Sequence, residues 1–328
     1  MEKINWGIIG CGDVTEVKSG PAFNKVPQSA LVAVMRRDAA KAADYARRHG
    51  VPKWYSDARQ LIDDPEVNAI YIATPPASHE EYTLAALQAG KPVYVEKPMA
   101  PGYAAAARMA GAAADARVKL VVAHYRRAQP LFRKIKQLLN DNAIGQPLLA
   151  SLALYKKPLT PEELRQPKTA WRVDAAVAGG GLFHDLAPHQ FDLVYHFFGP
   201  VEKACGMAVN QAGAYAADDM VAGTIVFKSG LVFNGAWCFN APHGEERDYC
   251  EIVGTEGKIR FSIFDHQPVT VTTNGKTTVF SFDVLPHVQQ PMIASVVDYF
   301  LDRGPNPCPA AEGVEVMQLI DRFTSRKT

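Results

Sequence analysis

The sequence predicts an α/β protein in which a doubly wound parallel sheet precedes an α/β domain with an open, largely antiparallel sheet. Up to residue 124, short apolar runs alternate with segments of helical spacing, a pattern typical of a parallel sheet covered by helices. From about residue 148, the apolar runs are instead joined by turn residues such as Asn274-Gly275, which indicate β-hairpins. We therefore expect two domains, residues 1–124 and 125–328.

The first domain is expected to alternate strands and helices. Apolar runs predict strands at residues 4–9, 31–35, 68–73, 92–95 and 119–123, with helices at 39–49 and 104–116. Another helix is expected to begin at Ser78, because Ser78 and Glu81 have the spacing of a capping box. Sheets of this kind bind ligands at the carboxyl ends of their strands, so the residues that follow each strand are candidates for binding.

A pair of glycines ends the first strand. The apolar run stops at Gly10-x-Gly12, and a helical segment begins with Asp13 and Val14. Gly10 permits a tight bend, Gly12 lets the backbone approach a pyrophosphate, and the helix N-terminus offers free N–H groups. Thr15 stands where this fingerprint has its third small residue, and a glycine pair alone also fits an ordinary turn. The strand and helix that follow favour a dinucleotide site.

The second strand is followed by Arg36, Arg37 and Asp38, where dinucleotide-binding proteins often carry an acidic residue for the ribose hydroxyl. A carboxylate repels a 2′-phosphate, whereas guanidinium groups bind one through paired hydrogen bonds. This interpretation predicts a preference for NADP(H), with NAD(H) still possible. In the alternative interpretation, both arginines are solvated and Asp38 caps the next helix.

The second domain is expected to consist of hairpins with one helix, residues 186–198, packed on their sheet. Two late helices, residues 288–301 and 311–323, close the chain and are expected to pack back on the first domain. Because an open sheet needs its second face covered, we expect self-association through it, as a homodimer or homotetramer.

Composition excludes several classes of partner. The formal net charge is +1, with 35 Lys and Arg residues against 34 Asp and Glu residues, so no overall field favours nucleic acid or an anionic membrane. The chain carries neither a signal-peptide pattern nor an apolar run of transmembrane length. Its five cysteines are scattered and lack metal-binding spacing, which indicates a reducing cytoplasm.

Lys97 follows the strand at 92–95 within Glu96-Lys97-Pro98. A lysine at this edge can hydrogen-bond a substrate hydroxyl or the ribose of a cofactor and stabilise negative charge that develops on an oxygen. Pro98 restricts the residue before it, and the bond between them is a candidate for the cis form. Taken alone, the segment also fits a surface lysine before a turn proline.

Asp185 and His189 follow the glycine run 179–181 and lie four residues apart. This spacing puts both side chains on one helix face, where the imidazole can accept a hydroxyl proton as hydride leaves the carbon. His189 also fits a buried histidine between domains. His184 adds a third possible metal ligand, but adjacent residues point apart, so no metal site is expected. His196 is expected to be structural.

An ordered set of motifs resembles the glucose-fructose oxidoreductase, inositol dehydrogenase and MocA (Gfo/Idh/MocA) family over essentially the whole chain. The set comprises Gly10-x-Gly12, Ala73-Thr74-Pro75 with His79, Glu96-Lys97-Pro98, Arg126-Arg127-x-x-Pro130, Gly179-Gly180-Gly181 and Asp185-x-x-x-His189. The resemblance implies a Rossmann domain, an α/β domain with an open antiparallel sheet, nicotinamide-dependent redox chemistry on sugars or polyols, and oligomers built through that sheet.

The resemblance also implies roles for individual residues. Lys97 would be the catalytic lysine, His189 the general base and Asp185 its substrate-orienting neighbour. Thr74, Pro75, His79 and Glu96 would line the nicotinamide and ribose side, and Arg126 a loop near the domain junction. His124-Tyr125 stands where many members have Tyr-Asn, which leaves the roles of His124 and Tyr125 open.

Aromatic and cationic residues ahead of the glycine run are candidates for substrate binding. Trp171 and Arg172, together with Tyr125 and Arg126, suit stacking on and hydrogen bonding to a polyhydroxylated ring, as does the segment Tyr155-Lys156-Lys157. Core packing of Trp171 and solvation of the lysines are equally compatible with the sequence.

These observations predict a cytoplasmic oxidoreductase that interconverts a secondary alcohol and a ketone on a sugar, polyol or diol, with NADP(H) preferred. Two alternatives stay open at this point. A glycosidase or epimerase could retain the cofactor and re-reduce its own substrate, or the chain could be a non-catalytic NAD(P)-binding regulatory protein.

Overall fold

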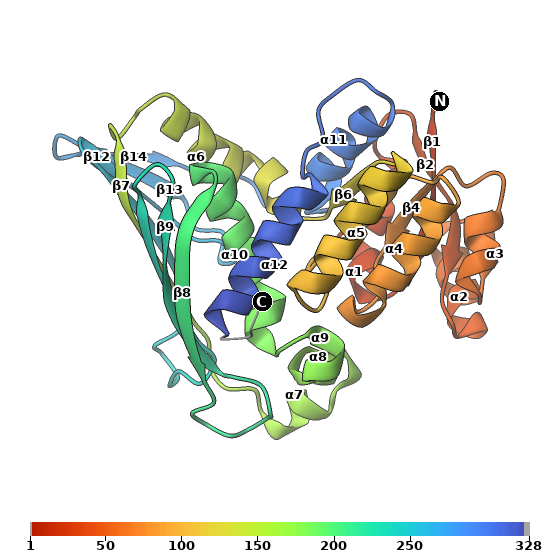
Figure 1. The fold of residues 1–328 in the computed structure, drawn as a ribbon, viewed down its shortest axis with the longest axis horizontal. Coiled ribbons are helices and arrows are strands. Elements are labelled where there is room, and N and C mark those ends of the chain that lie inside the picture. The colour runs from red at the N-terminus through yellow and green to blue at the C-terminus, as the bar shows by residue number, and fades with distance from the viewer. Residues whose placement is uncertain (1, 325–328) are drawn as a thin grey trace. The chain divides into compact units, whose positions relative to one another are not determined.

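The chain forms two compact units in the computed structural model, which describes residues 2–324 (Figure 1). Unit 1 is formed by the residues up to Gln129 together with Leu285–Met317, and unit 2 by Pro130–Val284 together with the residues from Gln318 onward. The expected division into functional domains at residue 124 stays a prediction. Within residues 2–324, no helix is both long and apolar enough to cross a membrane.

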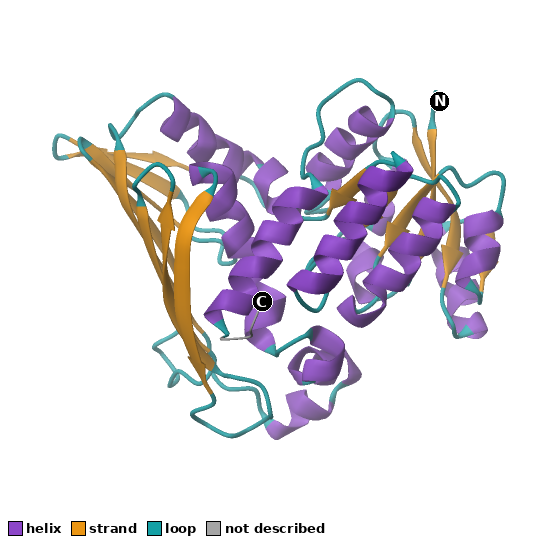
Figure 2. Ribbon diagram, viewed as in Figure 1, coloured by secondary structure: helices purple, strands orange, loops and turns teal. Residues whose placement is uncertain are grey.

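Unit 1 is built on a six-stranded parallel sheet with the order β3-β2-β1-β4-β5-β6. Figure 2 shows the strands of this unit in orange among its purple helices. The chain runs from β1 outward to β3 and then returns to β4 on the other side of β1. The gap between β1 and β4 is therefore a topological switch point, where such sheets bind ligands. Its strands are β1 (Ile4–Ile9), β2 (Ser29–Met35), β3 (Lys53–Tyr55), β4 (Ala69–Ile72), β5 (Val93–Val95) and β6 (Leu120–Val122).

Both faces of this sheet are covered. The buried ring of Trp6 packs against Phe23 and Phe300, with ring centroids 4.8 and 5.6 Å away. The next residue, Gly7, points to the opposite face, where a Cβ would lie only 2.6 Å from Leu61 Cδ2. The doubly wound parallel sheet expected from the sequence is therefore confirmed.

The start of helix α4 (His79–Gln88) in unit 1 differs from the prediction. The predicted capping box at Ser78 is wrong: the Ser78 hydroxyl lies 2.9 Å from Thr74 Oγ1 and 3.1 Å from Pro75 O, because residues 76–78 form a 3₁₀ turn. The helical elements are α1 (Asp13–Val17), η1 (Gly20–Asn24), α2 (Ala39–His49), α3 (Ala58–Asp63), η2 (Pro76–Ser78), α4 (His79–Gln88), α5 (Tyr103–Ala116), η3 (Tyr125–Ala128) and α11 (Gln290–Phe300).

Unit 2 contains an eight-stranded sheet with the order β14-β13-β12-β11-β7-β10-β9-β8. Within residues 2–324, β7 and β10 are the one parallel pair of this sheet, and every other pair is antiparallel. The sheet is thus largely antiparallel, as expected. Its strands are β7 (Pro147–Tyr155), β8 (Val201–Val209), β9 (Met220–Phe227), β10 (Val232–Cys238), β11 (Arg247–Gly254), β12 (Gly257–Phe261), β13 (Val269–Thr273) and β14 (Lys276–Phe280).

The helices of unit 2 are more numerous than predicted. The expectation of one helix on the sheet is wrong, because α6 buries an apolar stripe that includes Phe132, whose ring centroid lies 6.4 Å from that of Phe261 on β12. The expected helix also begins earlier, at Leu182. The helices are α6 (Pro130–Asn140), α7 (Pro161–Arg165), α8 (Pro167–Val173), α9 (Ala175–Ala178), α10 (Leu182–Phe198) and the last turns of α12 (Ala310–Phe323).

A buried tryptophan fixes α10 on the sheet. Trp237 of β10 packs edge-on against Phe183 and Phe191 of α10, with ring centroids 5.1 and 5.4 Å away. Its indole N–H donates to Gln190 Oε1 at 2.6 Å, which satisfies a donor that would otherwise be buried without a partner. The rotation of α10 about its axis is thereby set, and with it the direction of every side chain on the helix.

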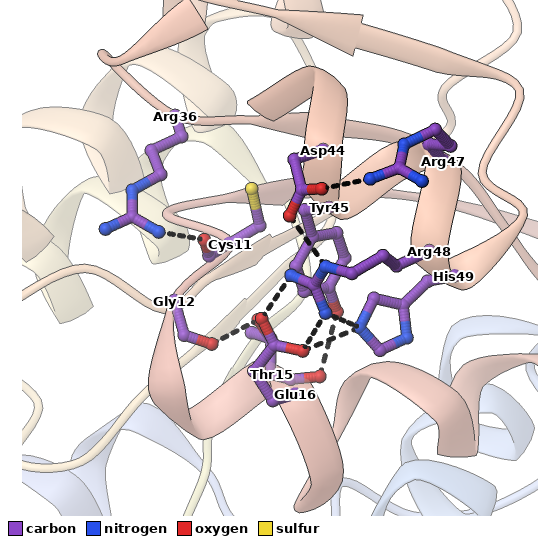
Figure 3. Close-up of polar contacts among 10 residues, drawn as sticks. All are labelled: Cys11, Gly12, Thr15, Glu16, Arg36, Asp44, Tyr45, Arg47, Arg48 and His49. Atoms are coloured by element: carbon purple, nitrogen blue, oxygen red, sulfur yellow. Dashed lines mark hydrogen bonds and ion pairs between the residues drawn. The ribbon is translucent and has the colours of Figure 1, made fainter. Parts of the chain in front are cut away.

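Helices α1 and α2 are joined by an ion-pair network (Figure 3). The Arg48 guanidinium donates to both oxygens of Glu16 at 2.7 Å and to Asp44 at 2.7 Å, and His49 Nε2 lies 2.8 Å from Glu16. The hydrogen bonds from Arg48 lower the pKa of Glu16 from 4.5 to about 2. Because α1 is short, this network helps to hold it at the end of β1.

This network predicts an acid-dependent contribution to stability. A carboxyl whose pKa falls to about 2 on folding stabilises the protein above its unfolded pKa of 4.5, and the contribution is lost as the pH falls from 4.5 towards 2. Since the Glu16 side chain is 35% exposed, we expect Glu16→Gln to lower the free energy of unfolding by no more than about 1 kcal/mol at pH 7, and by less at pH 3.5. Urea unfolding at both pH values tests this, with Glu81→Gln as the control; a deficit that does not shrink at pH 3.5 would contradict it.

Candidate functional site

The turn after β1 lies directly against the loop after β4. Gly10 has φ +93°, and a Cβ on it would lie 2.6 Å from Thr74 Cγ2 and 2.8 Å from the Thr74 backbone nitrogen. A side chain at position 10 would therefore be strained and would push Thr74 away from the switch point. The structure thus brings together two residues predicted separately, Gly10 and Thr74.

Gly12 presents open backbone at the start of α1. Among residues 2–324, a Cβ on Gly12 would lie within 4 Å of Gly10 O alone, at 3.8 Å. The space beside the Gly12 backbone is therefore open to a ligand. Asp13 and Val14 form the first turn of α1, and its leading N–H groups have no acceptor within the helix. Thr15 fills the third fingerprint position: it is fully buried, and its hydroxyl donates to Gly12 O at 2.8 Å. Its side chain therefore closes the turn from inside.

Arg36 lies beside the glycine turn, on the other side of Cys11 from the Glu16–Arg48 network (Figure 3). Its guanidinium makes one long hydrogen bond, 3.4 Å, to Cys11 O, while its backbone is held by Tyr55 O at 3.2 Å. Arg37 is exposed. Within residues 2–324 neither Arg36 nor Arg37 forms an ion pair. Asp38 instead caps α2, accepting from Lys41 N at 3.1 Å, as the alternative interpretation of this segment expected.

His79 connects the loops after β4 and β5. Its Nε2 lies 2.7 Å from Thr74 O, and its Nδ1 lies 3.0 Å from Pro98 O and 3.3 Å from Met99 O. The ring is fully buried, and burial lowers the pKa of His79, although the carbonyl groups act in the opposite direction. His79 thus sets the spacing between the two loops, and direct contact between His79 or the exposed Pro75 and a cofactor stays a prediction.

A buried carboxylate holds the backbone of Lys97. Glu96 Oε1 accepts from the Tyr71 hydroxyl and from Gln289 Nε2, both at 2.5 Å, and Glu96 Oε2 accepts from Lys97 N at 3.1 Å. Gln289 Oε1 in turn accepts from the Tyr94 hydroxyl at 3.0 Å. Burial and the neighbouring Glu96 raise the pKa of Tyr71 well above its usual range, so Tyr71 remains a donor. Lys97 is half-buried, and the Lys97–Pro98 bond is cis.

The segment after β6 is largely buried. Tyr125 is 6% exposed and His124 1%, while the Arg126 guanidinium lies 5.7 Å from the centroid of the Tyr125 ring. Arg127, also buried, donates to Glu312 Oε2 at 2.6 Å. The buried ion pair of Arg127 gives this turn a structural role, and substrate binding by Tyr125 and Arg126 stays a prediction.

The glycine run of unit 2 makes room for α10. A Cβ on Gly180 would lie 2.2 Å from His184 Cε1, and one on Gly181, where φ is +83°, would lie 2.5 Å from Ala217 Cβ. Side chains at these positions would displace the first turn of the helix that carries Asp185. His184 is 1% exposed. Residues 2–324 contain no group of three or more His, Cys, Asp or Glu side chains that could hold a metal ion.

Asp185 is paired with one of the predicted substrate-binding residues. Arg172 Nε lies 3.1 Å from Asp185 Oδ2, and the Arg172 guanidinium lies 5.0 Å from the centroid of the Trp171 ring. Trp171 and Arg172 belong to α8 and Asp185 to the first turn of α10. The structure therefore brings these three residues together, and the ion pair fixes the direction of the carboxylate.

His189 follows Asp185 by one helical turn. The imidazole is 4% exposed, and its centroid lies 5.8 Å from that of Phe264 in an edge-to-face contact. The amide of Phe264 donates to Asp248 Oδ2, as do those of Ile263 at 2.9 Å and Asp265 at 2.8 Å. A single carboxylate thus fixes the loop that packs on His189.

Gln289 is a site residue that the sequence did not reveal. It lies in the turn before α11 and bonds Glu96 across 193 residues of sequence. A lone glutamine before a helix carries no local signal of such a contact, which only the packing of α11 on the sheet creates.

Comparison with known proteins agrees with this geometry. Residues 4–124 match the oxidoreductase family with an NAD-binding Rossmann fold, and residues 132–260 match the GFO/IDH/MocA C-terminal domain. The chain is 45% identical to Oxidoreductase P35 of Formosa agariphila over 98% of each chain. It is 29% identical to 1,5-anhydro-D-fructose reductase of Ensifer adhaerens, over 82% of this chain and 79% of that one.

A solved structure has the same fold. Levoglucosan dehydrogenase in complex with NADH and levoglucosan superposes with a TM-score of 0.85 at 23% identity, covering 99% of this chain and 97% of that one. This likeness concerns the fold over nearly the whole chain. The protein belongs to the Gfo/Idh/MocA family of NAD-binding oxidoreductases.

Proposed function

We propose that the protein is an NADP(H)-preferring dehydrogenase or reductase that interconverts a secondary alcohol and a ketone on a sugar, polyol or diol. The observation that carries the proposal is Lys97, whose backbone is held by the buried Glu96 carboxylate at the same edge of the sheet as the Gly10 turn. The names of two similar proteins, 1,5-anhydro-D-fructose reductase and levoglucosan dehydrogenase, support a sugar-like substrate.

The residues at the switch point fit a dinucleotide. Gly10 is restricted to glycine by Thr74, Gly12 leaves open backbone for a pyrophosphate, and the leading amides of α1 offer donors to it. Thr74 and Pro75, with His79 and Glu96 behind them, would line the nicotinamide and ribose side. When bound, the nicotinamide gives or accepts the hydride.

Residues of the chain itself would transfer the proton and stabilise the negative charge that develops on the substrate oxygen. His189 takes the hydroxyl proton during oxidation and returns it during reduction, and Lys97 stabilises negative charge on the substrate oxygen. Asp185, fixed by Arg172, orients the substrate by accepting a hydrogen bond from a neighbouring hydroxyl. The ring of Trp171 offers an apolar surface to the carbon face of a sugar.

Preference for NADP(H) is supported by the charges after β2. Asp38 caps α2 and forms an ion pair with Lys41 at 3.1 Å, which is also compatible with the alternative interpretation, so the support comes from the two arginines. Arg36 and Arg37 retain donors that a 2′-phosphate can use.

Five free cysteines support a cytoplasmic location for the enzyme. Burial raises the pKa of the Cys11 thiol to about 11, which keeps this residue beside the glycine turn protonated and unreactive at neutral pH.

We further propose a homodimer or homotetramer formed through the exposed face of the unit 2 sheet. That face carries Met207, Val209 and Leu149, which are 76%, 48% and 37% exposed. Apolar side chains gathered on one sheet face are typical of association surfaces.

Replacing the two catalytic groups is expected to reduce turnover without loss of cofactor binding. His189→Ala removes the proton acceptor and is expected to lower kcat about 10²–10⁴-fold, and Lys97→Ala about 10²–10³-fold. Turnover is followed by nicotinamide absorbance with a panel of sugars and polyols, and NADPH binding by fluorescence. His196→Gln, on the same helix, is the matched control. Either alanine variant that folds, binds NADPH and turns over at the wild-type rate would refute the role assigned to that residue.

Cofactor preference is tested by removing the guanidinium groups. We expect NADP⁺ to have the lower KM in the wild type, and Arg36→Ala to raise that KM about 10–100-fold while the KM for NAD⁺ changes little, since one charged hydrogen-bonding group is lost. Arg37→Ala is expected to act in the same direction. Arg47→Ala, an exposed arginine of α2 paired with Asp44, serves as the control. A wild-type enzyme that prefers NAD⁺ would show that the alternative interpretation of Arg36 and Arg37 is correct.

Light scattering coupled to size-exclusion chromatography tests the assembly. The wild type is expected to elute with the mass of a dimer or tetramer, and Met207→Glu to shift the distribution towards the monomer, because it brings a charge into an apolar contact. Val17→Glu makes the same kind of change at a 58% exposed site in unit 1 and is expected to leave the mass unchanged. A monomeric wild type rules out the proposed interface.

A further inference from the structure

One carboxylate of β11 holds the loop between β12 and β13, residues 262–268. The backbone amides of Ile263 and Asp265 donate to Asp248 Oδ2 at 2.9 and 2.8 Å, and the amide of Phe264, which lies between them in sequence, donates to the same atom. Three consecutive N–H groups therefore converge on one oxygen, as in the anion-binding nests that backbone amides form. The position of this loop depends on the Asp248 side chain.

The strand register places Asp248 on the side of the sheet that α10 covers. Asp248 is paired with Leu154 of β7, and Leu154 is paired with Trp237 of β10, so the three side chains form one row across the sheet. Leu154 and Trp237 are fully buried, and Trp237 packs against α10. The residues on either side of Asp248 are exposed and point to the opposite face. The carboxylate and His189 therefore lie on the same side of the sheet.

The two oxygens of the Asp248 carboxylate differ in their contacts. While Oδ2 accepts three hydrogen bonds, Oδ1 is buried and has no hydrogen-bond partner within residues 2–324. A buried carboxylate oxygen without a partner lowers stability, so stability alone does not account for this aspartate. Departures of this kind from full hydrogen bonding are expected at functional sites.

The Phe264 ring connects the loop to the proposed proton acceptor. Its centroid lies 5.8 Å from that of the His189 imidazole, and the two rings meet edge to face at 74°, a favourable geometry for an aromatic pair. The Lys156 ammonium lies 5.9 Å from the centroid of the same ring, and the Lys156 backbone is held by a hydrogen bond of 2.8 Å to Cys238 O. With its own amide held by Asp248, Phe264 has little freedom to move away from His189.

Other contacts close the loop independently of Asp248. The Ser262 hydroxyl oxygen accepts from the amide of Gln267 at 2.8 Å, and His266 Nε2 lies 2.8 Å from Phe282 O. These contacts do not involve the carboxylate. Removal of the Asp248 side chain is therefore expected to release the three amides while the rest of the loop stays folded.

We propose that Asp248 is a positioning residue for His189. By holding the backbone of Phe264, it keeps the aromatic ring against the imidazole and so restricts the imidazole to one orientation. Proton transfer depends on this orientation, because a ring nitrogen must lie within hydrogen-bond reach of the substrate hydroxyl. The effect on turnover rests on the proposed function, whereas the effect on the imidazole itself does not.

Nuclear magnetic resonance tests the position of the imidazole without turnover. The full-length protein is labelled with ¹³C at histidine Cε1, and the His189 signal is assigned by its loss in His189→Gln. Phe264→Leu is expected to move this signal, because the ring current of the phenylalanine is lost. Asp248→Ala is expected to move it in the same direction and to broaden it. Asp248→Asn is expected to leave it close to the wild-type position, since the carboxamide oxygen can still accept from the three amides.

Turnover tests the consequence for catalysis, with the sugar or polyol that the enzyme converts fastest. Asp248→Ala and Phe264→Leu are each expected to lower kcat about tenfold with little change in KM, because a displaced base affects the transition state more than substrate binding. The double variant is expected to be no slower than Phe264→Leu, since Asp248 acts through that ring. Asp248→Asn is expected to restore most of the activity that Asp248→Ala loses.

Asp265→Asn is the matched control. Asp265 is exposed and belongs to the same loop, but it contacts Asp248 through its amide and not through its carboxylate, so the change is expected to alter neither the His189 signal nor kcat. The proposal is overturned if Asp248→Ala leaves the His189 signal at the wild-type position, or if Asp265→Asn has the same effects as Asp248→Ala. Phe264→Leu with the wild-type kcat also overturns it, whether or not Asp248→Ala folds.

Failure of the proposed function gives a different result. If the His189 signal moves as expected but His189→Ala turns over at the wild-type rate, Asp248 positions the imidazole and the role assigned to His189 in proton transfer is refuted. If His189→Ala is slow but Asp248→Ala and Phe264→Leu are as fast as the wild type, the proposed function stands and the positioning role of Asp248 is refuted.

Discussion

The Glu96 carboxylate is the constraint on which the organisation of unit 1 depends. A buried carboxylate is costly unless its oxygens accept hydrogen bonds, and here Tyr71, Gln289 and the Lys97 amide provide them. These donors come from β4, from the turn before α11 and from the segment after β5. Satisfying one charge therefore fixes three segments that are far apart in sequence, and it places Lys97 at the carboxyl edge of the sheet.

Unit 2 also buries a polar group that needs a hydrogen-bond partner, but here both partners, Trp237 and Gln190, are neutral. The indole of Trp237 needs an acceptor inside the core, and Gln190 of α10 supplies it at 2.6 Å. Because Gln190 follows His189 directly, the hydrogen bond that buries Trp237 also fixes the side of α10 on which the imidazole lies. Gly180 and Gly181 permit this position by leaving room for His184 and Ala217. The chemistry proposed for α10 thus depends on packing that involves none of the reacting groups.

Predictions from the sequence were most accurate for features whose signal lies in a few adjacent residues. Apolar runs located five of the six parallel strands and missed the short strand β3, and Gly10-x-Gly12 located the turn, because both signals reflect burial and backbone freedom at a few adjacent residues. Helix α6 was overlooked although Leu131, Ile135 and Leu138 have helical spacing, so that signal was present. The contacts of Gln289 with Glu96 and of Arg172 with Asp185 could not be predicted, since each joins segments that only the folded chain brings together.

The arginines discussed here differ in whether they form ion pairs. Those in ion pairs hold the structure together, and the others can bind a ligand. Arg48 and Arg172 form ion pairs with Glu16 and Asp185, so their donors are engaged in holding α1 and in orienting a carboxylate. Arg36 and Arg247 are in no ion pair within residues 2–324, yet each has its backbone fixed, by Tyr55 at the end of β3 and by pairing with β7. A guanidinium with free donors on a fixed backbone loses little entropy when it binds a phosphate or a hydroxyl pair. The structure thus distinguishes these four arginines by the groups that surround them.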